Sequence, residues 1–460
     1  MQKRIFLDKR YWALFGVGIS SFLGCMDFTI VNTALPSIQN SFNTSINQLQ
    51  WVINIFVLAL SANMVIMGRI ADIYGRKRIL YLGLFIFAIS SFFAGVSPSI
   101  NWLIFWRLIQ GISAAIFYTT SGAIASNIFD IEERGSAMGI FFGISFTGLA
   151  AGPVLGGLIV GSVGWRWIFL INVPLVVICL LICWLTIAES NSLNSNKKID
   201  YRGAVILMLG VTGLVFALTQ ANSWGWLSYK IILIFLFSGI MLALLYYEEK
   251  HITSPIINFS FFVNRKFISS IVATVGLAFF YCVAFFLMPL YLHLIKGESS
   301  YTIGLMLLPT TLCVALTSPY AGKIVDRKGP EKVLILGLFL FIFSAILQAN
   351  FSSNSSIIIL LIAFIFMGVA WGLIAGPSVV LAMSALPSSC EAFASGTLWT
   401  LHNIGGAIGL ALGVAVYREQ VTKHNNLFIF GYRSAMYLLV VSSTIALIIL
   451  LWNLRKEQIN

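Results

Sequence analysis

Long apolar segments constrain the fold of this chain more than any other feature. About 20 mainly apolar residues suffice to cross a bilayer as a helix, and the 460 residues contain fourteen such stretches. Only 10% of the residues are charged, whereas a soluble globular protein carries roughly 25%. Because a spanning segment must satisfy its own backbone hydrogen bonds, we predict an all-α integral membrane protein. The predicted spans are 11–35, 49–68, 79–97, 101–127, 136–160, 165–188, 201–220, 229–247, 267–290, 303–321, 333–349, 357–378, 394–416 and 435–452.

The positive charges indicate the orientation of these spans. Lys and Arg gather in the N-terminal tail and, among the loops, in 69–78, 197–202, 250–266 and 323–332, all on one predicted side. Cytoplasmic loops carry such an excess, so we predict a multi-pass protein of the cell membrane (the inner membrane of a Gram-negative cell) with both termini cytoplasmic. This distribution explains the net charge of +12 without a nucleic-acid partner. The six cysteines contain no CxxC pair and indicate no metal, disulfide or cofactor.

An internal repeat divides the chain. The sequences "GRIADIYG" (68–75) and "GKIVDRKG" (322–329) share Gly, Asp and Gly at one spacing, 254 residues apart. Glycines 111, 139, 148, 152 and 156 recur 257 residues later, at 368, 396, 405, 409 and 413. We therefore predict a six-helix N-terminal half (1–190), two linker transmembrane helices (191–250) and a six-helix C-terminal half preceded by an amphipathic segment (251–460).

Charged residues inside the spans are the candidates for function. With the spans above, Asp27 is the only carboxylate inside a membrane helix, Arg107 the only deeply placed base and His402 the only membrane histidine. Helical rise places Asp27 about 12 Å and Arg107 about 9 Å below the outer ends of their helices, so we expect the charges to pair. Intramembrane acids often mark proton pathways. The alternative is an arginine that reaches toward the headgroups and an aspartate that only neutralises it.

The chemistry of Asp27 suggests how a proton and a substrate could compete for one site. At the repeat offset the second half has Phe280 or Tyr281 in place of Asp27 and Phe364 in place of Arg107, so the scaffold does not require the charges. Desolvation disfavours the ionised carboxylate and a nearby arginine favours it, so a change of surroundings can load or release a proton. One carboxylate cannot neutralise a dication, which favours neutral or monocationic lipophilic substrates.

Five motifs resemble those of a known family: "MDFTIVNTALP" (26–36), "RLIQGISAA" (107–115), "GLAAGPVLGG" (148–157), "GWRWIFLINVPL" (164–175) and "PIINFSFFVNRKF" (255–267). The family is that of the fourteen-helix drug:proton antiporters of the major facilitator superfamily. The resemblance implies the major-facilitator fold, multidrug efflux by alternating access, antibiotic resistance, and a role for Arg107 in proton transfer. It does not imply an enzyme. Ile73 departs from the family's pattern, which has an arginine after the motif aspartate.

The motifs also have a physical interpretation. Gly148, Gly152 and Gly156 form a ridge of small residues that lets backbones approach closely, and Pro153 bends the helix. We expect Asp72 to lie against the positive N-terminal end of the helix starting near Ala394, and Asp326 to do the same to the fifth helix, so that both latch the cytoplasmic side. The alternative is a solvated turn that only fixes orientation. The predicted latch residues are Gly68, Asp72, Gly75, Arg76, Arg134, Gly322, Asp326 and Gly329.

Polar and aromatic residues of the spans are the candidate substrate ligands, although each could instead be a core residue. They are Asn32, Asn54, Gln110, Tyr281, Phe285, Trp371, Trp399, His402 and Asn403. The leading hypothesis is a proton-coupled exporter of lipophilic drugs, with membrane lipids around it and, in a Gram-negative cell, a periplasmic adaptor protein. The alternative cargo is an amino acid, a siderophore or a lipid-like metabolite. A polytopic membrane enzyme is disfavoured because no cluster of acids or histidines is evident.

Overall fold

Every regular element in the described part of the chain is helical. The computed structural model describes residues 9–44, 46–187, 200–252, 255, 257, 259–298, 300–424 and 427–457. The α-helices are α1 (Lys9–Phe42), α2 (Ile46–Tyr74), α3 (Arg76–Gly95), α4 (Ile100–Ile128), α5 (Arg134–Ser162), α6 (Trp167–Leu170), α7 (Asn172–Thr186), α8 (Tyr201–Trp224), α9 (Tyr229–Glu249), α10 (Arg265–Leu294), α11 (Ser300–Lys328), α12 (Pro330–Ala349), α13 (Ile357–Ser384), α14 (Glu391–Lys423) and α15 (Phe428–Glu457). Short 3₁₀ turns lie at Ile131–Glu133 (η1), Phe259–Val263 (η2) and Ser388–Cys390 (η3).

The prediction of fourteen spans is confirmed. Within the described residues, fourteen helical segments are long and apolar enough to cross a membrane, and α6 and α7 together form one of them. The linker helices α8 and α9 are among them, and the amphipathic segment 255–267 holds η2 and the start of α10. The boundary at 190/191 lies outside the described residues, and the division into 1–190, 191–250 and 251–460 stays a prediction.

The helices extend beyond the predicted spans at several ends, which corrects the count of charged groups. The prediction that Asp27 is the only carboxylate inside a membrane helix is wrong, because these helices also contain Asp72, Glu249, Asp326 and Glu391 near their ends. A terminal helical turn lies at headgroup depth, where polar side chains are tolerated. Because α10 also extends beyond its predicted span, it includes a second membrane-helix histidine, His293, in its last turn.

The sixth span is broken at Ile171, between α6 and α7. Pro174 explains the break, because proline has no N–H to donate to the carbonyl of Leu170 and its ring crowds that carbonyl. Proline is tolerated in the first turn of α7, where N–H groups lack helical partners anyway. Asn172 is the first residue of α7 and lies directly after the break.

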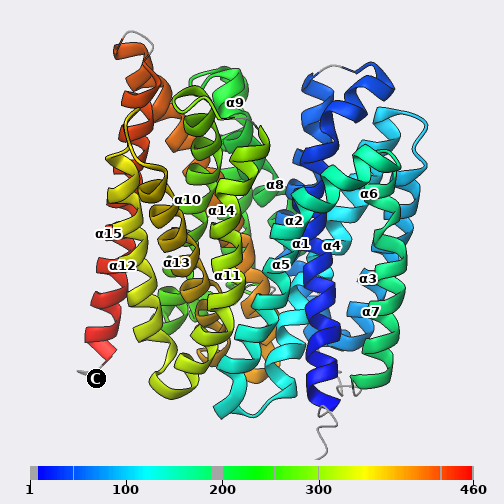
Figure 1. Cartoon of the computed structure of the whole chain (residues 1–460). Helices are drawn as coiled ribbons and strands as arrows, with labels where there is room; N and C mark the ends of the chain where they lie inside the picture. Colours follow the sequence, from blue (N-terminus) through cyan, green and yellow to red (C-terminus); the bar gives the residue numbers. More distant parts are fainter. Residues whose placement is uncertain are drawn as a thin grey trace, which may run out of the picture.

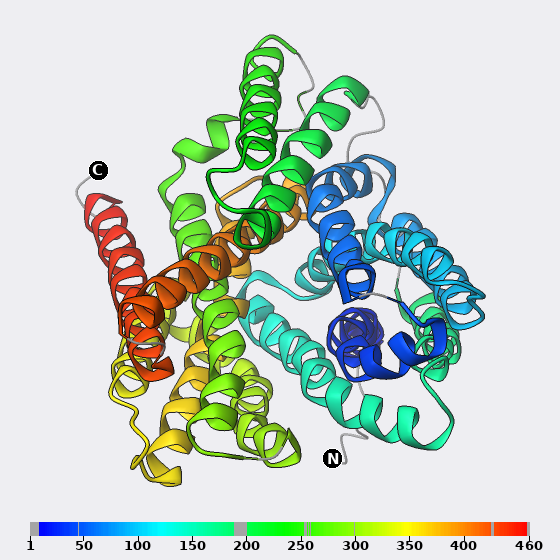
Figure 2. The same ribbon diagram turned by 90° about the horizontal axis from the view of Figure 1, so that it is seen from above.

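The N-terminal group of helices (α1–α7) and the C-terminal group (α10–α15) pack alike. In the first group α1 packs on α5, α2 on α4 and α3 on α4; in the second, α10 packs on α14, α11 on α13 and α12 on α13. Figure 2 shows the two groups side by side, with α8 and α9 beside them, and α8 packs on both α2 and α14. The repeat in the sequence is therefore a repeat in space.

Glycines allow the close approaches within each group. A methyl group on Gly148, Gly152 or Gly156 of α5 would collide with α1. A methyl group on the equivalent glycines of α14, at 405, 409 and 413, would likewise collide with α10. Pro153 lies on the exposed face of α5. The ridge of small residues thus has matching partners in the two groups, as expected for close helix packing in membranes.

The two groups meet near one end of the bundle, which we name the terminal side because the described chain begins and ends there (Figure 1). There α2 packs on α14 and α5 on α11. A methyl group on Gly68 would collide with the backbone of Ala392, and one on Gly322 with that of Gly135. Nearer the opposite side, a methyl group on Gly157 of α5 or Gly304 of α11 would meet no atom within 4 Å.

Candidate functional site

Asp27 and Arg107 form an ion pair inside the N-terminal group, as the sequence predicts. Arg107 Nη1 lies 2.5 Å from Asp27 Oδ2, and the two side chains are 1% and 0% exposed. The arginine therefore does not reach toward the headgroups. In this conformation neither charge is accessible to water or lipid, and a buried pair of this kind strongly resists the loss of either partner.

Arg107 has further partners on α2. Its Nε donates to the carbonyl of Val52 at 3.0 Å, and its guanidinium lies 4.2 Å from the centre of the Phe56 ring. Its Nη1 also donates to Gln110 Oε1 at 3.0 Å. The arginine is thus held by a charge on α1 and by a carbonyl dipole and an aromatic face on α2, and the α2 contacts do not depend on Asp27 being ionised.

Two residues that the sequence did not single out complete the network. Asn172 Nδ2 donates to Asp27 Oδ1 at 3.2 Å. Ser91 Oγ accepts a hydrogen bond from Gln110 Nε2 at 2.7 Å and lies 3.5 Å from Asn172 Nδ2. These side chains come from α1, α3, α4 and α7. Asn172 could have been found as the polar side chain that "GWRWIFLINVPL" places within an apolar helix.

The aromatic candidate residues come together in one cluster between the two groups. Tyr281 stacks on Trp371, with ring centres 4.5 Å apart, and Trp399 contacts His402 edge-on at 4.9 Å. His402 Nδ1 lies 3.1 Å from Thr274 Oγ1. The predicted members of this cluster are Tyr281, Phe285, Trp371, Trp399 and His402.

The N-terminal group supplies the other side of this aromatic cluster. Phe146 contacts Trp371 at 5.8 Å between ring centres, while Phe142 and Tyr118 lie 6.0 and 6.4 Å from Trp399. The repeat explains part of this asymmetry: the position equivalent to Asp27 is Phe280 or Tyr281, so one group carries the ion pair and the other carries aromatic rings. The aromatic cluster thus contacts both groups of helices.

The amide candidates are not brought together. Gln110 belongs to the ion-pair network, Asn32 is exposed on α1, and Asn54 is half-buried on α2. Asn403 Nδ2 lies 3.6 Å from the sulfur of Met64 on the opposing group. The structure therefore gives these amides no common site, unlike the aromatic residues.

The two motif aspartates make equivalent contacts across the terminal side. Asp72 accepts hydrogen bonds from two N–H groups in the first turn of α14, at 3.3 and 2.9 Å. Asp326 accepts from two N–H groups in the first turn of α5, at 2.6 and 2.8 Å. Both contacts are those that the sequence predicts, and both place a carboxylate at the positive end of a helix dipole. Gly75 and Gly329 follow with φ of 101° and 81°, which only glycine adopts easily.

A buried charge cluster reinforces this contact. Arg76 Nη2 donates to Asp72 Oδ1 at 2.8 Å, and its Nη1 donates to Glu391 Oε2 at 3.1 Å. Arg134 Nη1 donates to the other oxygen of Glu391 at 3.2 Å. Glu391 was not predicted, because its helix was expected to start at residue 394. The sequence signal for Glu391 was its position 257 residues after Arg134, which makes the two residues equivalent in the repeat. In the structure they contact each other.

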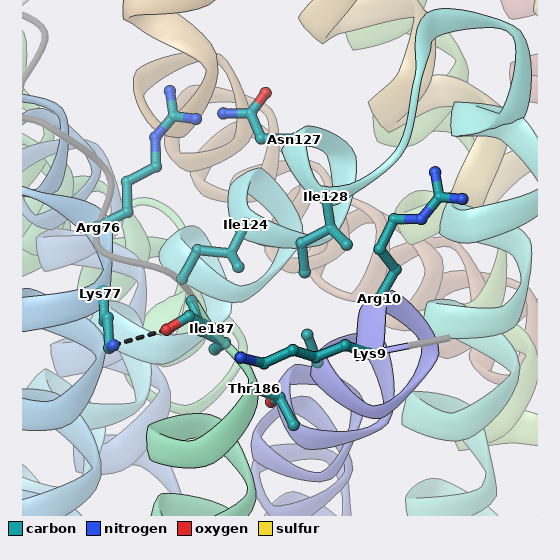
Figure 3. A pocket seen from close by; sticks show the side chains of 10 residues that line it. Lys9, Arg10, Arg76, Lys77, Ile124, Asn127, Ile128, Thr186 and Ile187 are labelled. Carbon is teal, nitrogen blue, oxygen red and sulfur yellow. Dashed lines mark hydrogen bonds between the residues drawn. The ribbon is translucent and has the colours of Figure 1, made fainter. Parts of the chain in front are cut away.

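A basic pocket adjoins this cluster on the terminal side (Figure 3). Lys9, Arg10, Arg76 and Lys77 line it from α1 and α3. Lys77 Nζ donates to the carbonyl of Ile187 at 2.6 Å, as the dashed line in Figure 3 marks. Arg76 thus belongs both to the wall of this pocket and to the charge cluster.

Two similar helix groups, with a buried ion pair in one of them and an aromatic cluster between them, are the arrangement expected of a membrane transporter. Residues 17–410 match the family profile of the Major Facilitator Superfamily. The chain therefore belongs to that superfamily.

Relatives and solved structures agree with this assignment. The chain is 31% identical over 403 residues to the multidrug resistance protein Stp of Mycobacterium tuberculosis, covering 87% of this chain and 74% of the relative. It is 26% identical to the riboflavin transporter RibZ of Clostridioides difficile (98% and 99% covered) and 28% identical to the multidrug export protein EmrB of Haemophilus influenzae (89% and 82%). The human organic anion transporter MFSD10 shares the fold, with a TM-score of 0.69 at 16% identity over 96% of this chain and 99% of that one.

Proposed function

We propose that this transporter exports neutral or monocationic lipophilic drugs in exchange for protons, with Asp27 as the group that takes up and releases the proton. The observation that carries the proposal is the ion pair of Asp27 and Arg107, enclosed in a hydrogen-bonded network inside a membrane helix group. Intramembrane ionisable residues are rare and usually mark ion or proton pathways. The multidrug names of Stp and EmrB support the substrate class.

The contacts of Arg107 suggest how protonation drives the conformational change. A proton on Asp27 removes the charge that α1 offers, and the arginine keeps its contacts with the Val52 carbonyl and the Phe56 ring on α2. The same helix carries Asp72, which binds the first turn of α14. After protonation Arg107 therefore remains bound to α2, the helix that closes the terminal side, and no longer to the charge on α1. The two halves must separate at that side during transport.

The aromatic cluster is the proposed substrate site. Faces of tyrosine and tryptophan attract cations and stack on planar rings, and neither interaction requires a fixed shape. Tyr118 links the aromatic cluster to α1, the helix that carries Asp27. Its hydroxyl donates to Cys25 Sγ at 3.3 Å, and its ring contacts Trp399. A substrate that moves Tyr118 acts on the segment next to Asp27.

A second candidate function is the transport of an endogenous planar metabolite. RibZ, whose name assigns it riboflavin, matches over 98% of this chain, more than the multidrug relatives above do. A stack such as that of Tyr281 on Trp371 suits a flat heteroaromatic ring as well as a drug. Competition by flavins against drug binding to the purified protein distinguishes the two cargoes.

The orientation follows the same proposal. With the terminal side in the cytoplasm, as the Lys and Arg distribution predicts, the contacts of α2 with α14 and of α5 with α11 close the transporter on its cytoplasmic side. Asp72, Asp326 and the cluster around Glu391 then latch the cytoplasmic side. A periplasmic adaptor protein stays a prediction that depends on a Gram-negative host.

Transport by Asp27→Asn tests the proposal. In inside-out vesicles with an imposed pH gradient, we expect the wild-type protein to accumulate ethidium and the variant to lose this uptake while reaching the membrane in equal amounts. Asp130→Asn is the matched control, because the side chain of Asp130 is 81% exposed and lies 3.6 Å from Nη1 of Arg10. Undiminished uptake by Asp27→Asn refutes the assigned role.

A further inference from the structure

Asn172 contacts Asp27 with only one end of its amide. Its Nδ2 donates to Asp27 Oδ1 at 3.2 Å, whereas its Oδ1 is buried and has no hydrogen-bond partner within the described residues. The residue is 0% exposed. A buried carbonyl oxygen without a donor is costly, and such a group calls for an explanation.

The two ends of the amide match the two states of a carboxyl group. An ionised carboxylate only accepts hydrogen bonds, while a protonated carboxyl also donates one through its O–H. An asparagine amide offers a donor at one end and an acceptor at the other. Rotation by about 180° around the bond to the amide carbon exchanges these ends, and this torsion is broad and roughly two-fold.

The side-chain amide of Asn172 makes its contacts with the neighbouring helices. Asn172 is the first residue of α7, after the break at Ile171, and Pro174 fixes the backbone two residues later. Arg107 is the charged group in contact with Asp27, and Cys25 with Tyr118 are the neighbouring titratable groups. The contacts of Asn172 with α1 and α3 come from its amide nitrogen.

We propose that Asn172 is a positioning residue whose amide rotates with the protonation of Asp27. Its N–H donates to the carboxylate, and its carbonyl accepts the O–H of the protonated acid. The proton comes from water and forms the new O–H bond on Asp27, while no covalent bond of Asn172 changes. The amide of Asn172 thus stabilises both protonation states of Asp27. In the protonated state its Oδ1, which otherwise has no donor, accepts the O–H of Asp27. This inference rests on the proposed role of Asp27.

Difference infrared spectroscopy of the purified protein after a pH step tests this inference. In wild-type protein labelled with ¹³C at the side-chain amide carbon of asparagine, we expect two signals together: the C=O band of a protonated carboxyl and a shifted amide C=O band. Both should be lost in Asp27→Asn. In Asn172→Leu, which has similar volume and no polar group, the amide signal should vanish and the acid band should move to higher frequency because its O–H loses its acceptor.

Asn63→Leu is the matched control. Asn63 is another buried asparagine, whose amide donates to the Ala59 carbonyl on α2, so both signals should remain. An acid band without an amide shift in the wild type, or an identical acid band in Asn172→Leu, overturns this inference and leaves the role of Asp27 intact. The absence of any acid band that depends on Asp27 overturns both. If Asn172→Leu fails to fold, the labelled wild-type spectrum still decides.

Discussion

Gly322→Ala should open the terminal side, because the added methyl group has no room while that side is closed. The ideal position of this methyl carbon is 2.8 Å from the carbonyl carbon of Gly135 and 3.0 Å from Cα of Ser136. Both are backbone atoms, so relief requires α5 and α11 to separate. Overpacking of this kind costs about 1–3 kcal/mol, and only in the closed state. At about 1.4 kcal/mol per tenfold change, the closed-to-open ratio falls by about 5- to 150-fold.

Distance measurements between spin labels on opposite groups report this shift. Labels at positions 131 and 328, in a background without the native cysteines, lie near the junction of η1 and α11, where side chains are exposed. We expect the distance distribution of Gly322→Ala to gain a longer component. Gly239→Ala is the control, since a methyl group there meets nothing within 4 Å. An unchanged distribution in Gly322→Ala, or an equal change in the control, refutes the reasoning.

Three further predictions concern the charge cluster, the aromatic cluster and the packing within one half. Glu391→Gln removes the charge that Arg76 and Arg134 bind, so it should weaken the closed terminal side by about 1.5–3 kcal/mol and lengthen the same spin-label distances. Glu419→Gln, on the surface, should leave these distances unchanged, and equal behaviour of the two variants contradicts the latch. Trp371→Leu removes the ring that stacks on Tyr281. Because an aromatic pair contributes about 0.5–1.5 kcal/mol, the dissociation constant for ethidium in a fluorescence titration should rise about 2- to 10-fold. Trp184→Leu, at an exposed site, is the control, and unchanged affinity in Trp371→Leu places the substrate elsewhere. Gly111→Ala puts a methyl group 2.8 Å from Ala59 Cβ and 3.1 Å from Phe56 Cα. Thermal unfolding in detergent should therefore begin at a lower temperature than for Gly161→Ala, whose added methyl group has no atom within 4 Å. Equal stability of the two variants contradicts the assigned packing.

The sequence predicted the features that depend on local chemistry. Fourteen spans follow from length and hydropathy alone, since lipid leaves the backbone no partner but itself. The repeat was readable because glycines mark close approaches, and Gly68 and Gly322 do approach the opposite group. The contacts of Asp72 and Asp326 followed from placing the repeated motif beside helix N-terminal ends.

Other features depend on partners that the sequence does not name. Glu391 was missed because α14 continues beyond its apolar stretch, where hydropathy no longer reports helix. The aromatic candidates converge because they share the inward faces of their helices, whereas the amide of Gln110 is taken up by Arg107. Asn172 is the first residue after the break in the sixth span, and the hydropathy of that span does not report where its polar side chain lies.

The release of protons by the purified transporter on substrate addition tests the central role of Asp27 most directly. In weakly buffered detergent solution with a pH indicator, ethidium should release protons from the wild-type protein and none from Asp27→Asn, at concentrations that saturate binding to both. Equal proton release by the two proteins would contradict the account.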